Sequence, residues 1–95
     1  MAQPKEIHKL IDGLLRNFGI ETKVKEHMAL VFWPDVVGEV INNISKPLNI
    51  MDGILFVKVE SSTWRAELTL HKESIIKKLN KKVGKPVIAE IRFIS

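Results

Sequence analysis

The sequence predicts an α+β fold in which helices cover one face of a three-stranded sheet and leave the other face open. Three observations predict it. Apolar residues recur every three or four positions between residues 7 and 44, as in amphipathic helices. After Ser45 the apolar period falls to two, which is typical of strands. A further helical pattern then runs from Ser61 to Gly84 and is followed by a last alternating run. The expected order is α-α-β-β-α-β.

The first predicted helix covers residues 7–18. Its apolar residues lie at i, i+3, i+4, i+7, i+8 and i+11, which places them on one stripe: Ile7, Leu10, Ile11, Leu14, Leu15 and Phe18. Pro4 can start this helix and Gly19 can end it.

The second predicted helix has apolar residues at steps of four, namely Val24, Met28, Phe32, Val36, Val40 and Ile44, reinforced by Val31, Val37 and Ile41. Pro34 interrupts it, because proline lacks the N–H and crowds the carbonyl four residues back, at a cost of about 3 kcal/mol. We expect a kink or two abutting helices at Pro34, with Trp33 at the junction.

Asp52-Gly53 predicts a two-residue hairpin, because both central positions of a type I′ turn need positive φ. Pairing outward from the turn sets four pairs opposite each other: Met51 and Ile54, Ile50 and Leu55, Asn49 and Phe56, Leu48 and Val57. In this register one face is apolar and is expected to join the core: Leu48, Ile50, Leu55, Val57 and Val59. The other face receives Met51, Asn49, Phe56, Lys58 and Glu60.

Ser61 and Ser62 are both good N-caps for the third predicted helix, and Gly84 and Pro86 end it. Its apolar seam contains Trp64, Leu68, Ile75 and Leu79, flanked by Ile76 and Val83. Trp33 and Trp64 both lie on apolar seams and are expected to be core residues rather than stacking platforms, since a buried Trp contributes a large apolar area.

The last predicted strand covers residues 87–94. Its alternation assigns Val87, Ala89, Ile91 and Phe93 to the core, and Ile88, Glu90, Arg92 and Ile94 to the outer face.

The composition is that of one globular domain, residues 1–95, with 45% hydrophobic and 27% charged residues. The chain has no cysteine, which excludes disulfides, thiol nucleophiles and thiolate metal sites and fits a reducing compartment. No apolar run approaches the roughly 18 residues of a membrane span, and no secretory signal pattern is visible. We therefore expect a cytoplasmic protein without membrane contact.

The net charge of +4 is unevenly distributed. Residues 1–60 carry seven Lys and Arg against eight Asp and Glu, whereas residues 61–95 carry eight against three. A one-sided positive surface suits phosphate backbones or an acidic protein, and charge alone does not separate the two.

Several segments together resemble the DciA-like family, bacterial proteins associated with the replicative DNA helicase and long catalogued as a domain of unknown function. They are Trp33-Pro34-Asp35-Val36-Val37-Gly38, Pro47 before a strand, Gly53-Ile54-Leu55-Phe56-Val57-Lys58-Val59, Ser62-Thr63-Trp64-Arg65-Ala66-Glu67-Leu68, Leu79-Asn80 with Gly84, and Ile91-Arg92-Phe93. The resemblance implies a KH-like domain that binds single-stranded DNA and assists the helicase. The glycines never form the G-x-x-G loop of KH domains, so any nucleic-acid contact must use other surfaces.

Lysines concentrate near the end of the third predicted helix, mostly off its apolar seam: Lys72, Lys77, Lys78, Lys81, Lys82 and Lys85. Five of them stand between residues 77 and 85 with no acid among them, and a polyanion would relieve their mutual repulsion. The alternative is that these lysines form a solvent-exposed helix face without a ligand, because the helix macrodipole favours lysines near a helix C-terminus.

Phe56 is expected on the outer sheet face with Lys58 and near Arg92. An aromatic ring among cations on an open sheet is a candidate platform for stacking bases. The alternative is sheet packing or a protein contact, including a dimer, and Ile88 and Ile94 on that face favour a protein partner.

Catalytic and metal-binding patterns are missing from the sequence. His8, His27 and His71 are 19 and 44 residues apart, and no G-x-S-x-G, P-loop or G-x-G-x-x-G motif occurs. We expect no enzyme activity, no cofactor and no metal. The sequence thus predicts a nucleic-acid-binding accessory domain, with a protein-interaction module that docks a partner through the open sheet as the alternative.

Overall fold

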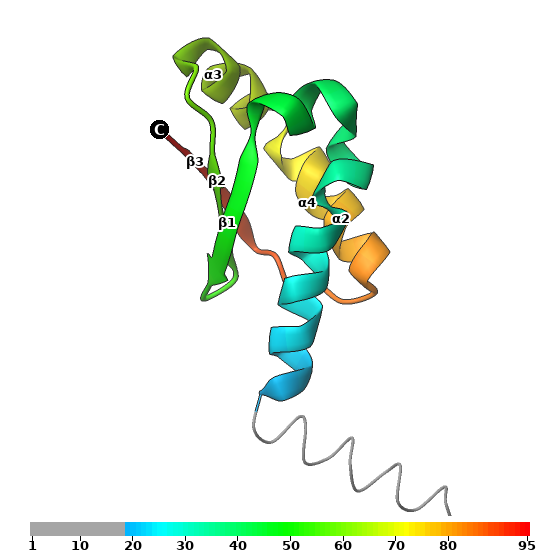
Figure 1. The fold of residues 1–95 in the computed structure, drawn as a ribbon. Coiled ribbons are helices and arrows are strands. Elements are labelled where there is room, and N and C mark those ends of the chain that lie inside the picture. The colour runs from blue at the N-terminus through cyan, green and yellow to red at the C-terminus, as the bar shows by residue number, and fades with distance from the viewer. Residues whose placement is uncertain (1–18) are drawn as a thin grey trace, which may run out of the picture.

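A three-stranded mixed sheet packs against two long helices in the computed structural model, which describes residues 19–95 (Figure 1). The elements are α2 (Ile20–Ile44), β1 (Lys46–Met51), β2 (Ile54–Lys58), α3 (Ser62–Leu70), α4 (Lys72–Val83) and β3 (Glu90–Ile94). The predicted α+β class is confirmed. The first predicted helix, residues 7–18, lies outside the described residues.

The strands follow the order β1-β2-β3, with β1 antiparallel and β3 parallel to β2. The parallel pair requires a crossover, which α3 and α4 supply. Figure 1 shows α2 and α4 together on one side of the sheet and α3 at one of its ends. No described helix covers the opposite side, so residues 19–95 leave the outer face of the sheet open.

The non-helical point of α2 is Gly38, not Pro34 as predicted. Gly38 has φ 85° and ψ 170°, a conformation that only glycine adopts without strain. Pro34 lies inside the helix. The break therefore falls one turn beyond the proline, at the residue that tolerates it, and Trp33 is not at the junction.

The apolar stripe predicted for α2 is also wrong in part, since Val24, Val31 and Val40 are 53%, 59% and 66% exposed. The buried residues are instead Glu26, Ala29 and Trp33. Steps of four exceed the helical repeat by about 40° each, so five such steps turn about 200° around the helix. Residues at the two ends of that series cannot share one face.

The hairpin turn is as predicted, with Asp52 at φ 52° and Gly53 at φ 78°. The pairs nearest the turn are also confirmed, as far as Asn49 opposite Phe56. Beyond them the register shifts at a bulge, so that Val57 faces Pro47 instead of Leu48, which is 42% exposed. Pro47 cannot donate to a sheet ladder, and bulges are among the few places where strands accept it.

The third predicted helix is two helices, α3 and α4, separated at His71 with φ −102° and ψ 5°. The predicted caps are present, since Ser61 Oγ accepts from Trp64 N at 3.2 Å and Gly84 N donates to Asn80 O at 2.8 Å. The predicted seam survives the break: Leu68, Ile75, Leu79 and Val83 are buried.

The last strand begins later than predicted, at Glu90. In the residues before it, the assignment of side chains to the core and to the outside also differs from the prediction. Ile88 is buried and Ala89 is exposed, the reverse of the prediction. The side chain of Asn80 explains the difference: its Nδ2 donates to Ile88 O and its Oδ1 accepts from Ile88 N, both at 2.9 Å. We call this pair of hydrogen bonds the amide clamp. It replaces strand pairing for the backbone of Ile88 and turns the Ile88 side chain inward.

The core between the sheet and the helices is centred on large side chains with no exposed area, including Trp33, Leu55 and Leu79. Trp33 Nε1 donates to Ser45 Oγ at 3.0 Å, and Ser45 in turn donates to Ile41 O, which satisfies the indole and fixes the turn into β1. Trp64 is only half-buried and packs at the edge of this core. The sequence prediction therefore holds for Trp33 and overstates the burial of Trp64.

Candidate functional site

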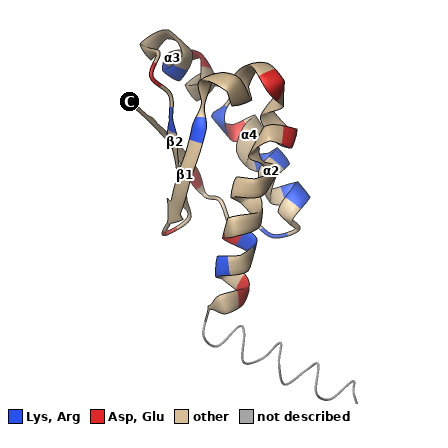
Figure 2. Cartoon of the chain, in the orientation of Figure 1, with Lys and Arg blue, Asp and Glu red and all other residues tan. Residues whose placement is uncertain are grey.

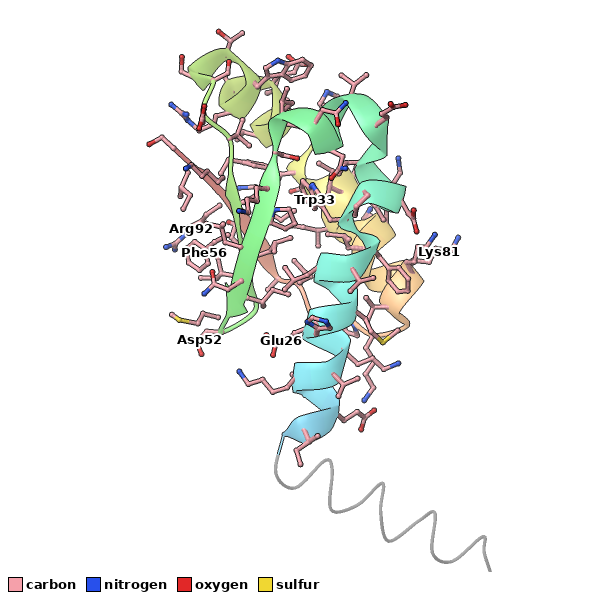
Figure 3. All side chains as sticks on the ribbon, viewed as in Figure 1. Glu26, Trp33, Asp52, Phe56, Lys81 and Arg92 are labelled. Carbon is pink, nitrogen blue, oxygen red and sulfur yellow. The ribbon has the colours of Figure 1, made fainter. Side chains whose placement is uncertain are left out.

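The outer sheet face is defined by three rows of residues from β1, β2 and β3. The registers set Met51 beside Ile54 and Glu90, Asn49 beside Phe56 and Arg92, and Lys46 beside Lys58 and Ile94. Neighbouring strands lie about 4.8 Å apart, so residues of one row are in reach of each other. Figure 3 shows Phe56 and Arg92 pointing away from the helices on this face.

Phe56 occupies the middle of this face and is half-buried by its neighbours, while Asn49 and Arg92 beside it are exposed. The prediction that Phe56 lies outside the core and next to Arg92 is confirmed. A ring in this position offers a flat apolar surface to solvent between polar and cationic side chains.

Lys46, Lys58 and Arg92 form no ion pair with any residue in the range 19–95. The acid of the same three rows, Glu90, has its carboxylate occupied: Lys72 Nζ lies 3.0 Å from its Oε1, and Ile91 N donates to the same oxygen at 2.8 Å. The outer sheet face therefore carries a positive excess.

Lys46 was missed by the sequence analysis. In an unbroken register it would point to the core side, opposite Val59, and the bulge at Pro47 moves it opposite Lys58 on the outer face. The signal that could have revealed it is Pro47, because proline within a strand favours a bulge.

The lysines predicted on the third helix fall into two groups. Lys72, Lys82 and Lys85 are engaged within the domain: Lys72 with Glu90, Lys82 with Asp35 at 3.8 Å and over the Phe32 ring at 5.6 Å, and Lys85 with Glu21. Lys77, Lys78 and Lys81 are exposed and form no ion pair with the described residues. We call these three the α4 lysine cluster.

The α4 lysine cluster and the outer sheet face lie on opposite sides of the domain. Figure 2 shows basic residues on the helical side and a separate set on β1 and β2, and Figure 3 places Lys81 far from Phe56 and Arg92. The predicted site residues are thus not brought together as one surface. A short ligand that contacts Phe56 cannot contact Lys81 at the same time.

The Lys72–Glu90 pair makes the stability of the fold depend on pH. The hydrogen bond from Lys72, with that from Ile91 N, holds the pKa of Glu90 below its usual range. A lowered folded-state pKa stabilises the fold above the unfolded-state value, and this stabilisation is lost as pH falls through the folded-state value. We expect Glu90→Gln to lower the melting temperature at pH 7, with the gap closing on acidification towards pH 3.

Thermal melts of wild type and Glu90→Gln between pH 7 and pH 3 measure this gap. Glu39→Gln is the matched control, since Glu39 is exposed and pairs with no described cation. A gap that stays constant over this pH range would show that the charge of Glu90 does not matter.

Within residues 19–95, no three His, Asp or Glu side chains gather as a metal site would require. None of the helices described there is both long enough and apolar enough to cross a membrane.

Comparison with known proteins finds one matching family model and a group of similar proteins. A family model described as "Dna[CI] antecedent, DciA" matches residues 6–93. A UPF0232 protein of Rhodococcus jostii is 33% identical over 90 residues, which are 95% of this chain and 48% of that protein. A UPF0232 protein of Mycobacterium tuberculosis is 29% identical over 93 residues, which are 98% of this chain and 50% of that protein. The chain spans about half the length of these relatives. Because the family model matches nearly the whole sequence, the chain belongs to the DciA family.

Proposed function

We propose that this domain is a non-catalytic nucleic-acid-binding accessory of DNA replication, which binds single-stranded DNA and assists the replicative helicase. The observation that carries the proposal is the position of Phe56 in the middle of a sheet face that no helix of residues 19–95 covers, with Lys46, Lys58 and Arg92 around it. Base stacking on an aromatic side chain contributes about 1 to 3 kcal/mol per base, and the cations neutralise phosphates.

The α4 lysine cluster provides a second contact surface in this proposal, one that meets phosphates only. Lys72, Lys82 and Lys85 contribute less there, because each already has a carboxylate partner. Such surface pairs are worth about 0 to 1 kcal/mol, so a phosphate can compete for these lysines. Since the two surfaces face opposite ways, they meet different segments of a strand.

The link to the helicase is supported by membership of the DciA family. The KH-like comparison is also part of the proposal, supported by helices on one face of a three-stranded mixed sheet. Without a G-x-x-G loop, the strand contacts fall to the outer sheet face and the α4 lysine cluster.

The alternative function is a protein-interaction module that docks a partner through the outer sheet face. It is favoured by the exposed apolar side chains that share this face with Phe56, since Met51 is 56% and Ile94 38% exposed. Ile88, predicted to support the same alternative, is buried and no longer does so. Phosphate contacts weaken steeply with salt, whereas an apolar protein contact does not.

Titration of a fluorescent single-stranded oligonucleotide at several salt concentrations tests both surfaces. Phe56→Ala is expected to weaken binding by about 1 to 3 kcal/mol and to leave the salt dependence unchanged.

The double variant Lys77→Gln/Lys81→Gln is expected to flatten the slope of log affinity against log salt by about 1.4, at roughly 0.7 per lysine.

Leu70→Ala is the control for Phe56→Ala, because Leu70 is 79% exposed on α3 and lies outside both surfaces. If wild-type protein shows no oligonucleotide binding at low salt, the nucleic-acid proposal is wrong. If Phe56→Ala binds as wild type does, bases do not stack on the outer sheet face.

A further inference from the structure

A hollow of about 490 Å³ lies at one end of the outer sheet face, and two of the cations already assigned to phosphate contact, Lys46 and Lys58, line it. Its walls are the turn from α2 into β1 and the connection from β2 to α3. Figure 1 shows these two segments at the end of the sheet where α3 lies. The charged residues of its lining are Lys46, Lys58 and Glu60.

Lys46 and Lys58 are register partners in the antiparallel pair of β1 and β2. Like charges directly opposite each other on one sheet face are destabilising. Neither ammonium forms an ion pair with a residue in the range 19–95, so no salt bridge there offsets the repulsion. An anion held between the two lysines would remove it.

The uncharged residues of the lining are Asn43, Ile44, Ser45 and Ser61, and two of them offer neutral donors. Ser61 Oγ accepts from Trp64 N and donates to no described residue, so its proton is available to a ligand. Asn43 is exposed at the end of α2, with an amide that can also donate. Ser45 is already used, between Trp33 and Ile41, and its part is to fix the turn that carries Lys46. Two ammonium groups with hydroxyl and amide donors match the oxygens of a phosphate.

We propose that this hollow is a phosphate subsite, which takes the phosphate of the nucleotide whose base stacks on Phe56. The assignment to a nucleic-acid phosphate rests on the proposed function. Lys58 and Phe56 point to the same face two residues apart, a distance of about 6.7 Å along the strand. One nucleotide can span from base to phosphate over this distance, so the bound strand runs along β2.

Glu60 also lines the hollow and has the wrong charge for this ligand. A substitution of Glu60 is therefore expected to change the affinity for the oligonucleotide in the opposite direction to a substitution of the lysines. Removal of its charge by Glu60→Gln is expected to tighten oligonucleotide binding several-fold at low salt, an effect that partial unfolding would not produce.

The main experiment compares Lys46→Gln/Lys58→Gln with wild type in the salt titration of the oligonucleotide. Loss of the one phosphate that the two lysines share is expected to flatten the salt slope by about 0.7, so that the affinity change between 50 and 200 mM salt falls by about 2.6-fold. Lys23→Gln/Lys25→Gln is the matched control: it removes the same net charge from α2, outside the hollow. Equal slopes for the two double variants would overturn the proposal.

A second experiment tests the hollow without the polymer. Wild-type protein is titrated with inorganic phosphate, against chloride at equal ionic strength, and the backbone amides are followed by NMR. Phosphate-dependent shifts are expected at Lys46, Lys58 and Ser61 and are expected to vanish in Lys46→Gln/Lys58→Gln. If these shifts are absent, there is no phosphate subsite even if the oligonucleotide binds. If the shifts are present while wild type binds no oligonucleotide, the subsite stands as a phosphate site, whereas its assignment to nucleic acid fails with the proposed function.

Discussion

Trp33→Ala is expected to remove a large share of the free energy of unfolding of the domain. The side chain of Trp33 has no exposed area and belongs to the core cluster between α2 and the sheet. Truncation of a buried Trp costs about 3 to 5 kcal/mol, and domains of ordinary stability have only about 5 to 15 kcal/mol available. The substitution also removes the donor to Ser45 Oγ, which fixes the turn into β1. Urea unfolding followed by circular dichroism measures the loss.

Trp64→Ala is the matched control for this prediction. It removes the same side chain from a half-buried position and is expected to cost clearly less. Equal losses for the two variants would mean that Trp64 is as much a part of the core as Trp33, as the sequence alone predicted.

Asn80→Ala is expected to destabilise the domain by about 2 to 6 kcal/mol, from two backbone groups that lose their partners. The substitution removes both partners of the Ile88 backbone, the donor to its carbonyl and the acceptor for its N–H. Ile88 is 2% exposed, and a buried backbone group left without a partner costs about 1 to 3 kcal/mol. The loss is expected in urea unfolding, together with faster amide exchange in β3.

Asn43→Ala is the control, since Asn43 is exposed and forms no hydrogen bond with the described residues. Asn80→Asp separates the two bonds: it keeps an acceptor for Ile88 N and places a negative charge against Ile88 O, so it is expected to lie between wild type and Asn80→Ala. Wild-type stability of Asn80→Ala would refute the importance of the clamp.

Features determined by neighbouring residues could be predicted from the sequence. The Asp52-Gly53 turn, the pairs next to it and the cap at Ser61 each depend on a few consecutive residues, and all agree with the structure. The seam of Leu68, Ile75 and Leu79 also agrees, because burial of one helix face is a periodic property.

Features determined by distant residues could not be predicted in the same way. The inward position of Ile88 depends on the amide of Asn80, eight residues earlier, which no alternation pattern contains. The helix break was expected at Pro34 and lies at Gly38, a glycine that accepts φ 85° without strain and that the sequence analysis did not weigh.

The candidate site shows the same division. The outward position of Phe56 follows from the hairpin register and could be predicted. The opposed lysines 46 and 58 could not be, because they depend on a bulge that reverses the side of Lys46. The separation of the α4 lysine cluster from Phe56 follows from the predicted placement of the helices on one face of the sheet and of Phe56 on the other.

The pairing of β3 with β2 has a consequence for the order of folding. Hairpin partners such as Met51 and Ile54 are close in sequence, whereas the parallel pairs, such as Ile54 and Glu90, are 36 positions apart. Contacts between distant residues form late, because the loop between them must be closed first. During synthesis the hairpin can therefore be complete while one edge of β2 still has unpaired backbone groups, an arrangement that invites pairing with another chain. That edge of β2 is paired only when residues 90–94 have left the ribosome and β3 has taken its place as the edge strand.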